Sequence, residues 1–197
     1  MADARTQKDD DSGLTRLQQF AIPLVFVGAM WCVEIVDALT PGALDSHGIH
    51  PRTDEGVFGI VFAPMLHGDW GHLIANSVPL VVLGTLLMLS GLRTFVGVTA
   101  IVWLVGGAAV WLLAGSHSNH IGASGLVFGW IGYLVARGAF SRSIGQIVIG
   151  LLVLASYWTA VFGVLPGQPG ISWQGHLFGA IAGVLAAWLW ESKRTSE

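Results

Sequence analysis

The hydrophobic positions of this 197-residue chain fall into six long apolar segments. Each has about 20 residues, enough at 1.5 Å per helical residue to cross a hydrocarbon core about 30 Å thick. None shows the alternation of barrel strands, and irregular backbone cannot face lipid, so we predict six helices. The predicted spans are residues 20–39, 73–92, 94–114, 121–140, 144–165 and 171–190.

These spans predict an all-α membrane protein built as a compact bundle of six transmembrane helices, in a domain covering residues 17–191. We expect a disordered cytoplasmic tail at 1–16 and a short cytoplasmic tail at 192–197, because both segments are polar. Four of the five connections are short, and only residues 40–66 form a sizeable loop.

Composition supports the membrane prediction and excludes other classes of protein. Hydrophobic residues make up 53% of the chain, charged residues only 11%, and the mean hydropathy is +0.68, which excludes a soluble globular domain. The net charge of −3 provides no basic surface, so nucleic acid is not an expected partner. The single cysteine, Cys32, excludes an internal disulfide.

Basic residues are distributed asymmetrically over the predicted connections. Eight fall on the side that holds both termini and only Arg52 falls on the other, so the positive-inside rule predicts cytoplasmic termini. All seven histidines then lie in the outer half of the molecule. The eight residues are Arg5, Lys8, Arg16, Arg93, Arg137, Arg142, Lys193 and Arg194.

Polar groups inside membrane spans are costly and usually mark functional sites. The second, fourth and sixth spans run from outside to inside, and each carries such residues in its first two turns: His72 and Asn76, Ser124, and His176. His72 and Asn76 are four residues apart and share one helix face. The expected N-caps of the three helices are Asp69, Asn119 and Ser172.

A serine and a histidine on facing helices provide a nucleophile and a general base. We therefore predict a dyad of Ser124 and His176, with an oxyanion stabilised by His72, Asn76 and the Ser124 backbone N–H. Two structural explanations compete with it. A membrane-helix serine often bonds its own i−4 carbonyl, and a buried histidine can be a core residue.

Glycines four residues apart mark the fourth and sixth spans and are typical of closely packed membrane helices. They are Gly125 and Gly129 in one span, and Gly175, Gly179 and Gly183 in the other. If the two glycine faces meet, Ser124 and His176 come together at one depth.

Three motifs resemble the rhomboid family of intramembrane serine proteases. Gly122-Ala123-Ser124-Gly125 resembles the family's G-x-S-G nucleophile motif, and His176 followed by Gly179 and Gly183 resembles its sixth-helix motif. The stretch from His67 through His72 to Asn76 reproduces the pattern H-x-x-x-x-H-x-x-x-N. The resemblance implies oxyanion roles for His72 and Asn76, and His67 looks more structural.

The resemblance also implies substrates that are transmembrane proteins, cut near the outer end of their helices, and residence in a lipid bilayer, that of the bacterial cell membrane. Two features depart from the family. Phe58-Gly59 stands where many bacterial members have a W-R pair, which questions the anchoring of that loop. Phe128 replaces the tyrosine of a well-studied type, although its ring can still stack on His176.

Two loops bear on how water reaches the serine. Residues 163–170, rich in Gly and Pro, form either a lid or an ordinary turn between the last two spans. The polar residues 116–120 precede Ser124 and could retain water near it.

Two other functions compete with proteolysis. One is a rhomboid-like pseudoprotease that binds membrane helices without cutting them, although such proteins typically lose the Ser or the His. The other is a metal carrier using the seven histidines. We expect no metal and no cofactor, because no H-E-x-x-H motif occurs and no acidic ligand lies deep in the spans.

Overall fold

The computed structural model describes residues 15–40 and 44–194. This part of the chain is helical, without a β-strand; its strand-like pairing is an isolated antiparallel bridge between Ile49 and His120. The α-helices are α1 (Arg16–Leu39), α2 (Asp54–Phe62), α3 (Trp70–Met88), α4 (Leu92–Ile101), α5 (Gly107–Leu113), α6 (Ser124–Ser141), α7 (Ile144–Ser156) and α8 (Trp173–Arg194). Shorter helical turns are η2 (Asp45–His47), η3 (Ala63–Met65), the π-helical η4 (Val102–Gly106) and η5 (Trp158–Val164).

The predicted all-helical membrane class is confirmed, whereas the count of six spans is only partly matched. Three described helical stretches are long and apolar enough to cross a membrane: Leu17–Leu39, Trp70–Met88 and Leu92–Leu113. Taken as one span, α7 and η5 make a fourth. Helix α6 is not among these stretches, because its glycines and Arg137 lower its mean hydropathy. Most of its residues are buried or half-buried inside the bundle.

Several predicted boundaries differ from the observed ones. The single helix expected over 144–165 is wrong, because α7 ends at Ser156 and η5 is bent away from it by 66°. The second span ends at Met88, and Gly91, with φ +95°, makes the turn into α4. Within the loop expected over 40–66 lies α2, whose N-cap Thr53 accepts a hydrogen bond from Gly56 N.

The expected tails extend mostly beyond the part of the chain that the structure describes. Of the segment 1–16, only residues 15 and 16 are described, and the helix α1 begins there behind its N-cap Thr15. Of the segment 192–197, the backbone as far as Arg194 continues α8. The basic residues Arg5 and Lys8, which enter the topology argument, lie outside the described residues.

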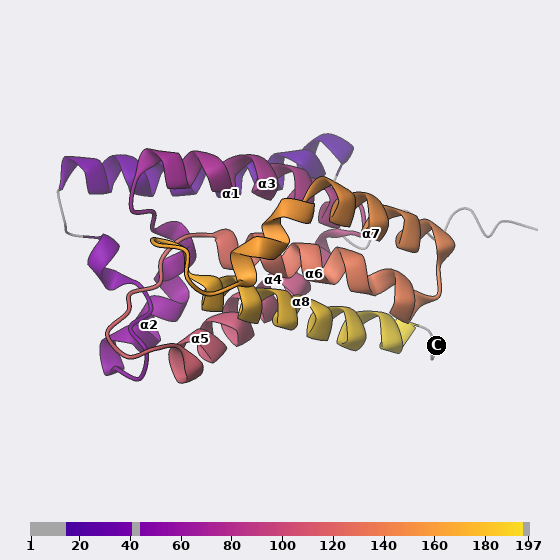
Figure 1. Cartoon of the computed structure of the whole chain (residues 1–197). Coiled ribbons are helices and arrows are strands. Elements are labelled where there is room, and N and C mark those ends of the chain that lie inside the picture. The colour runs from indigo at the N-terminus through magenta and orange to yellow at the C-terminus, as the bar shows by residue number, and fades with distance from the viewer. Residues whose placement is uncertain (1–14, 41–43, 195–197) are drawn as a thin grey trace, which may run out of the picture.

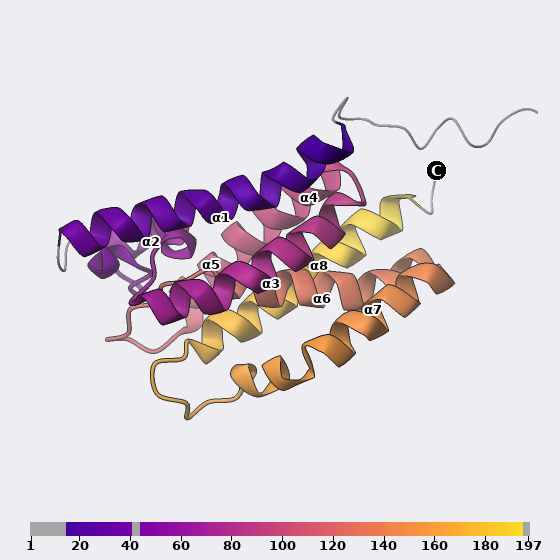
Figure 2. The same ribbon diagram turned by 90° about the horizontal axis from the view of Figure 1, so that it is seen from above.

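Helix α6 lies at the centre of the bundle and packs along α8, which runs along the lower edge in Figure 1. Figure 2 shows α3 and α7 on opposite sides of α6. The main apolar core gathers around α6, α8 and α3. Fully buried members include Leu73, Leu80, Leu83, Trp130 and Leu134. A rigid centre of this kind holds fixed any side chains that project from the ends of α6 and α8.

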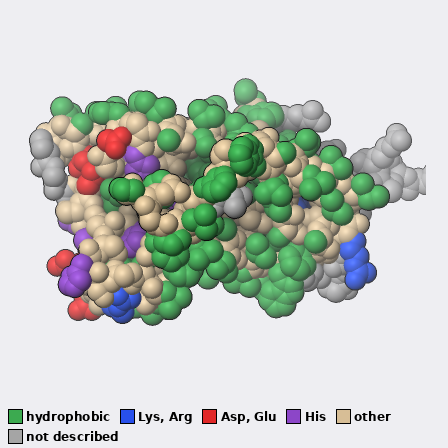
Figure 3. Space-filling model, in the orientation of Figure 1, with side chains coloured by type: hydrophobic (Ala, Val, Ile, Leu, Met, Phe, Trp, Pro, Cys, Tyr) green, Lys and Arg blue, Asp and Glu red, His purple; other side chains and the backbone are tan. Residues whose placement is uncertain are grey.

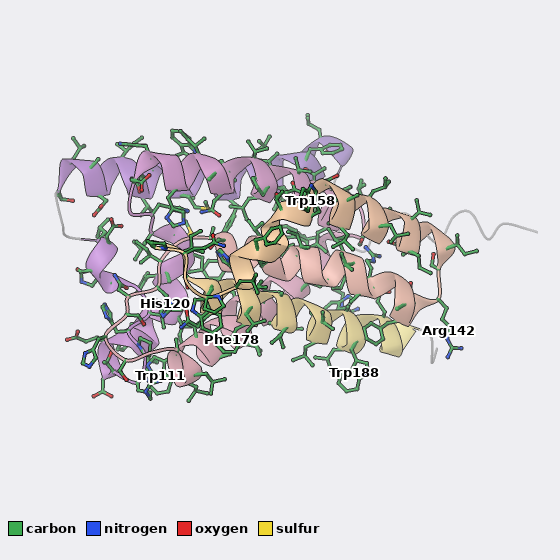
Figure 4. The ribbon with its side chains drawn as sticks, in the orientation of Figure 1. Trp111, His120, Arg142, Trp158, Phe178 and Trp188 are labelled. Carbon is green, nitrogen blue, oxygen red and sulfur yellow. The ribbon has the colours of Figure 1, made fainter. Side chains whose placement is uncertain are left out.

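Charged side chains lie toward the two ends of the molecule. Figure 3 shows acidic and histidine side chains at the end that contains α2, and hydrophobic side chains over the middle. Arg142 lies at the opposite end (Figure 4), where its left-handed backbone ends α6. This distribution fits a bundle whose middle faces lipid.

Arg137, which was counted among the basic residues of the connections, lies inside a helix instead. It lies within α6, is 5% exposed, and its Nε is 3.8 Å from a carboxylate oxygen of Glu191 in α8. Its Nη1 donates to Ser90 Oγ, and Tyr133 Oη donates to Glu191. This buried network joins α6 and α8 at the end of the bundle away from α2.

Candidate active site

Ser124 and His176 are in direct contact across the α6–α8 interface. Ser124 is the first residue of α6 and His176 lies in the first turn of α8, and Ser124 Oγ is 2.8 Å from His176 Nε2. His176 is 9% exposed. The serine and histidine that we singled out from sequence are therefore brought within hydrogen-bond reach.

The close approach of the two helices depends on glycines from both. A Cβ at Gly179 would collide with the carbonyl oxygen of Gly125, and one at Gly183 with that of Gly129. The two glycine faces meet as expected, with backbone against backbone. This contact fixes the depth of α8 relative to α6, and so the height of His176 relative to Ser124.

The other ring nitrogen of His176 is held by a backbone carbonyl, since His176 Nδ1 lies 2.9 Å from Gly163 O. A carbonyl can only accept, so Nδ1 carries the hydrogen and Nε2 presents its lone pair to the Ser124 hydroxyl. The Phe128 ring stacks on the imidazole at 4.0 Å between centroids and 8° between planes. The ring is thus fixed in the tautomer that a general base needs.

His72 lies beside the segment that leads into Ser124. A Cβ at Gly122 would stand 2.5 Å from Cε1 and 2.6 Å from Nε2 of the His72 ring, so only glycine leaves room. Gly122 also has φ +102°, a conformation that L side chains rarely adopt. Gly122 therefore lets the imidazole approach the backbone two residues before the serine.

Asn76 lies one helical turn deeper than His72 on the same face of α3. It is 5% exposed, and its Nδ2 donates to the His72 carbonyl at 3.1 Å, which leaves its second amide hydrogen for another acceptor. Asp69 caps α3 as expected, accepting from His72 N at 2.9 Å. The cap fixes where α3 begins and thereby the direction of His72.

His67 contacts the segment that leads into Ser124. It is 1% exposed, its Nε2 lies 3.5 Å from Ala123 N as acceptor, and its ring packs edge-on against His72 with 5.0 Å between centroids. Burial, followed by the like charge of His72, lowers the pKa of His67 to about 4. His67 is then neutral near pH 7 and available as an acceptor.

A small cavity of about 50 Å³ lies behind the serine, between η4, α6 and α8. Its lining is mostly apolar, with polar groups from Ser124, His120 and Ser172. One water needs roughly 10–15 Å³ of such volume and two or more polar partners. The cavity has room for a few water molecules next to the Ser124 side chain.

The loop before α2 is anchored without a W-R pair. Arg52 Nη1 donates to the carbonyls of Leu112 and Ala114, at 2.9 and 2.7 Å, where α5 ends. Trp111 Nε1 donates to Thr53 O at 2.9 Å. The anchoring that the departure from the family pattern put in question is therefore provided by Arg52 and α5.

Three features of the site were missed by sequence reasoning. The carbonyl of Gly163 has no signal in a sequence, because every residue has one. Asn119 was wrongly expected as an N-cap: α6 begins after Ala123, and Asn119 Nδ2 donates instead to Asp45 O. The expected cap Ser172 does accept from Gly175 N, but it also contacts His120, and no pattern in the sequence pairs these two residues.

Comparison with known proteins identifies the family of the chain. A family model described as Rhomboid domain matches residues 54–193, a range that contains every residue of the site. An uncharacterized protein of Mycobacterium tuberculosis (strain ATCC 25618 / H37Rv) is 49% identical over 174 residues, covering 84% of this chain and 72% of that protein. One of Mycobacterium leprae (strain TN) is 47% identical over 174 residues, covering 84% and 69%. The chain belongs to the rhomboid family.

Proposed function

We propose that this protein is an intramembrane serine endopeptidase, which cuts transmembrane protein substrates near the outer end of their helices. The observation that carries the proposal is the 2.8 Å contact between Ser124 Oγ and His176 Nε2, with Nδ1 held by Gly163 O. This is the geometry of a nucleophile with its general base. Family membership supports the same reaction class.

In the proposed acylation step, His176 Nε2 accepts the Ser124 proton while Oγ attacks the carbonyl carbon of the scissile peptide bond. The resulting tetrahedral intermediate collapses as His176 returns the proton to the leaving amine, and an ester to Ser124 remains. The Gly163 carbonyl takes the position of the carboxylate in a catalytic triad: it orients the ring and accepts from Nδ1–H. Two side chains therefore suffice for the proton transfers.

The negative charge of the intermediate needs donors near the start of α6. The Ser124 N–H is in the first turn of that helix, where backbone N–H groups have no partner within the helix and the dipole favours an anion. His72 and the second amide hydrogen of Asn76 are the side-chain donors. Gly122 and Gly125 are assigned supporting roles, in the approach of His72 and in the α6–α8 contact.

We expect Asn76→Ala to reduce kcat by about 10²- to 10³-fold, the usual loss when one oxyanion donor is removed. The variant should keep the fold, because among the described residues the side chain of Asn76 bonds within its own helix. Cleavage rates in liposomes and thermal unfolding in detergent measure the two quantities. Unchanged turnover would make Asn76 a packing residue and would remove it from the site.

Deacylation requires water at a serine that lies inside the bundle. In this proposal the cavity behind Ser124 and the polar residues 116–120 supply it, and His176 Nε2 removes the water proton. The segment 163–170 is a candidate lid: residues 165–171 are exposed, and the segment joins the general base through Gly163.

We further propose six spans in the bacterial cell membrane, with α6, α8 and the bent α7–η5 pair completing the bundle, and with both termini in the cytoplasm. The Lys and Arg asymmetry supports this orientation. A reporter fused after Glu197 should register as cytoplasmic, and one inserted in the loop before α2 as external. The opposite pattern would place the site at the wrong membrane surface for the proposed substrates.

The pseudoprotease is the second candidate function, since the named relatives are uncharacterized. One experiment separates it from the protease: purified wild-type protein in liposomes is incubated with a transmembrane substrate whose helix is weakened near its outer end. Cleavage is the expected result. Capture of the substrate without cleavage would favour the pseudoprotease.

The metal carrier has less support. Among the residues that the structure describes, no group of three or more His, Cys, Asp or Glu side chains is arranged to hold a metal ion. His67 and His72 contact the segment before Ser124, and His176 contacts Ser124 itself. Cleavage that persists in excess chelator would agree with the proposed dyad.

A further inference from the structure

A second serine–histidine pair lies beside the first, with the two residue types exchanged. His120 precedes Ser124 by four residues, and Ser172 precedes His176 by four residues. His120 Nδ1 is 2.6 Å from Ser172 Oγ. Figure 4 shows His120 at the end of the molecule where Trp111 also lies, on the loop that leads into α6. The same two segments are therefore joined twice.

The protons of this pair can be assigned from the surrounding hydrogen bonds. Ser118 Oγ donates to Gly115 O at 2.6 Å, so it accepts from Nε2–H of His120 at 2.8 Å. His120 Nδ1 then has a lone pair, which accepts from the Ser172 hydroxyl. Ser172 Oγ in turn accepts from Gly175 N at 3.2 Å. Each donor in this chain has one acceptor when His120 is neutral.

His120 is held firmly on its own side of the contact. It is 7% exposed, and its backbone pairs with Ile49 in both directions, at 2.9 and 3.1 Å. Burial, followed by the like charge of His50, lowers the pKa of His120, which favours the neutral ring. The imidazole is thus a fixed point, connected through Ile49 to the loop before α2.

The His120–Ser172 contact adds a restraint on the first turn of α8. This turn follows an exposed connection, 165–171, in which Gly167 and Gly170 have positive φ. The tight glycine contacts with α6 lie at Gly179 and Gly183, after His176, whereas a Cβ at Gly125 would meet the Gly175 carbonyl oxygen only at an ordinary 3.5 Å. Ser172 is both the cap of α8 and the partner of His120, so its hydroxyl restrains the turn that carries the general base.

We propose that His120 is a positioning residue of the reaction, which through Ser172 holds the first turn of α8 at hydrogen-bond distance from the start of α6. The proposal rests on the proposed proteolytic function. His120 does not touch the reacting atoms; it acts through Ser172, and so on the distance between Ser124 Oγ and His176 Nε2. Displacement of reacting groups by about 1 Å can cost about 10²-fold in rate.

The test compares His120→Phe, Ser172→Ala and their double variant with wild type in liposomes. We expect kcat to fall about 10- to 100-fold in each single variant with KM within about twofold, because substrate contacts remain. The kcat of the double variant should fall no further than that of the slower single variant, since both substitutions break the same His120–Ser172 contact. Ser172→Thr, which keeps the hydroxyl and the cap, should restore kcat. A matched control is His47→Ala, an exposed histidine whose ring bonds, in the described part of the chain, stay within its own turn.

Full kcat in both single variants, additive losses, or a rise in KM with unchanged kcat would each overturn the proposal. A wild type that neither cleaves nor reacts with a fluorophosphonate would instead overturn the proposed function. The contact itself is tested separately by nitrogen-15 NMR of labelled histidine: His120 should carry its hydrogen on Nε2, and Ser172→Ala should shift its Nδ1 signal. An Nδ1–H tautomer in wild type would show that the assigned hydrogen bonds are wrong.

Discussion

A fluorophosphonate is expected to label wild-type protein at Ser124, to leave Ser124→Ala unlabelled, and to label His176→Ala about 10² to 10⁴ times more slowly. A serine hydroxyl is a weak nucleophile until a base takes its proton, and positioned general bases contribute factors of this size. His176 Nε2, at 2.8 Å from Oγ, is the base. Gel fluorescence and mass spectrometry of the labelled peptide measure rate and position.

Cleavage of a transmembrane substrate should be lost in the same two variants. Nucleophile and base act as a unit, so the double variant should be no slower than either single one. Thermal unfolding serves as the control, since Ser124→Ala removes one hydroxyl and no apolar contact. Labelling that survives in Ser124→Ala would identify another nucleophile, and Ser172, with its own histidine at 2.6 Å, is the first to test.

The sequence singled out residues that the structure brings to neighbouring helix ends, among them Ser124 and His176, which are in contact. Polar residues in apolar spans are few because they are costly, so Asn76, Ser124 and His176 stood out against their neighbours. Their common depth followed from the direction of the spans. The glycine spacing added a reason for two of them to meet, and the contact of Gly125 with Gly179 agrees with it.

The parts that the sequence missed depend on contacts between distant segments. His120 and Ser172 are 52 residues apart, and neither has a local pattern that names the other. The bend after Ser156 falls in a continuous apolar run, where periodicity gives no signal for a break. The helix α2 is short, and in the sequence it appeared only as part of the loop 40–66. Each of these needs tertiary structure to be recognised.

The second large effect is expected from Gly183→Ala, which should abolish cleavage and lower the Tm in detergent. The added Cβ would collide with the Gly129 carbonyl oxygen and would lie 2.9 Å from Tyr133 N. Both atoms belong to the α6 backbone and cannot move aside as a flexible side chain would. Overpacking typically costs 1–3 kcal/mol, and a clash with backbone should reach at least the upper part of that range.

Gly28→Ala is the matched control, because a Cβ at Gly28 in α1 would meet nothing within 4 Å and alanine favours a helix by up to about 1 kcal/mol. This variant should keep wild-type cleavage and an equal or higher Tm. Equal behaviour of the two variants would mean that the α6–α8 contact does not set the distance between Ser124 and His176. If Gly183→Ala folds but labels slowly with a fluorophosphonate, the loss comes from misplacement of the dyad, because the substituted residue lies two helical turns from His176.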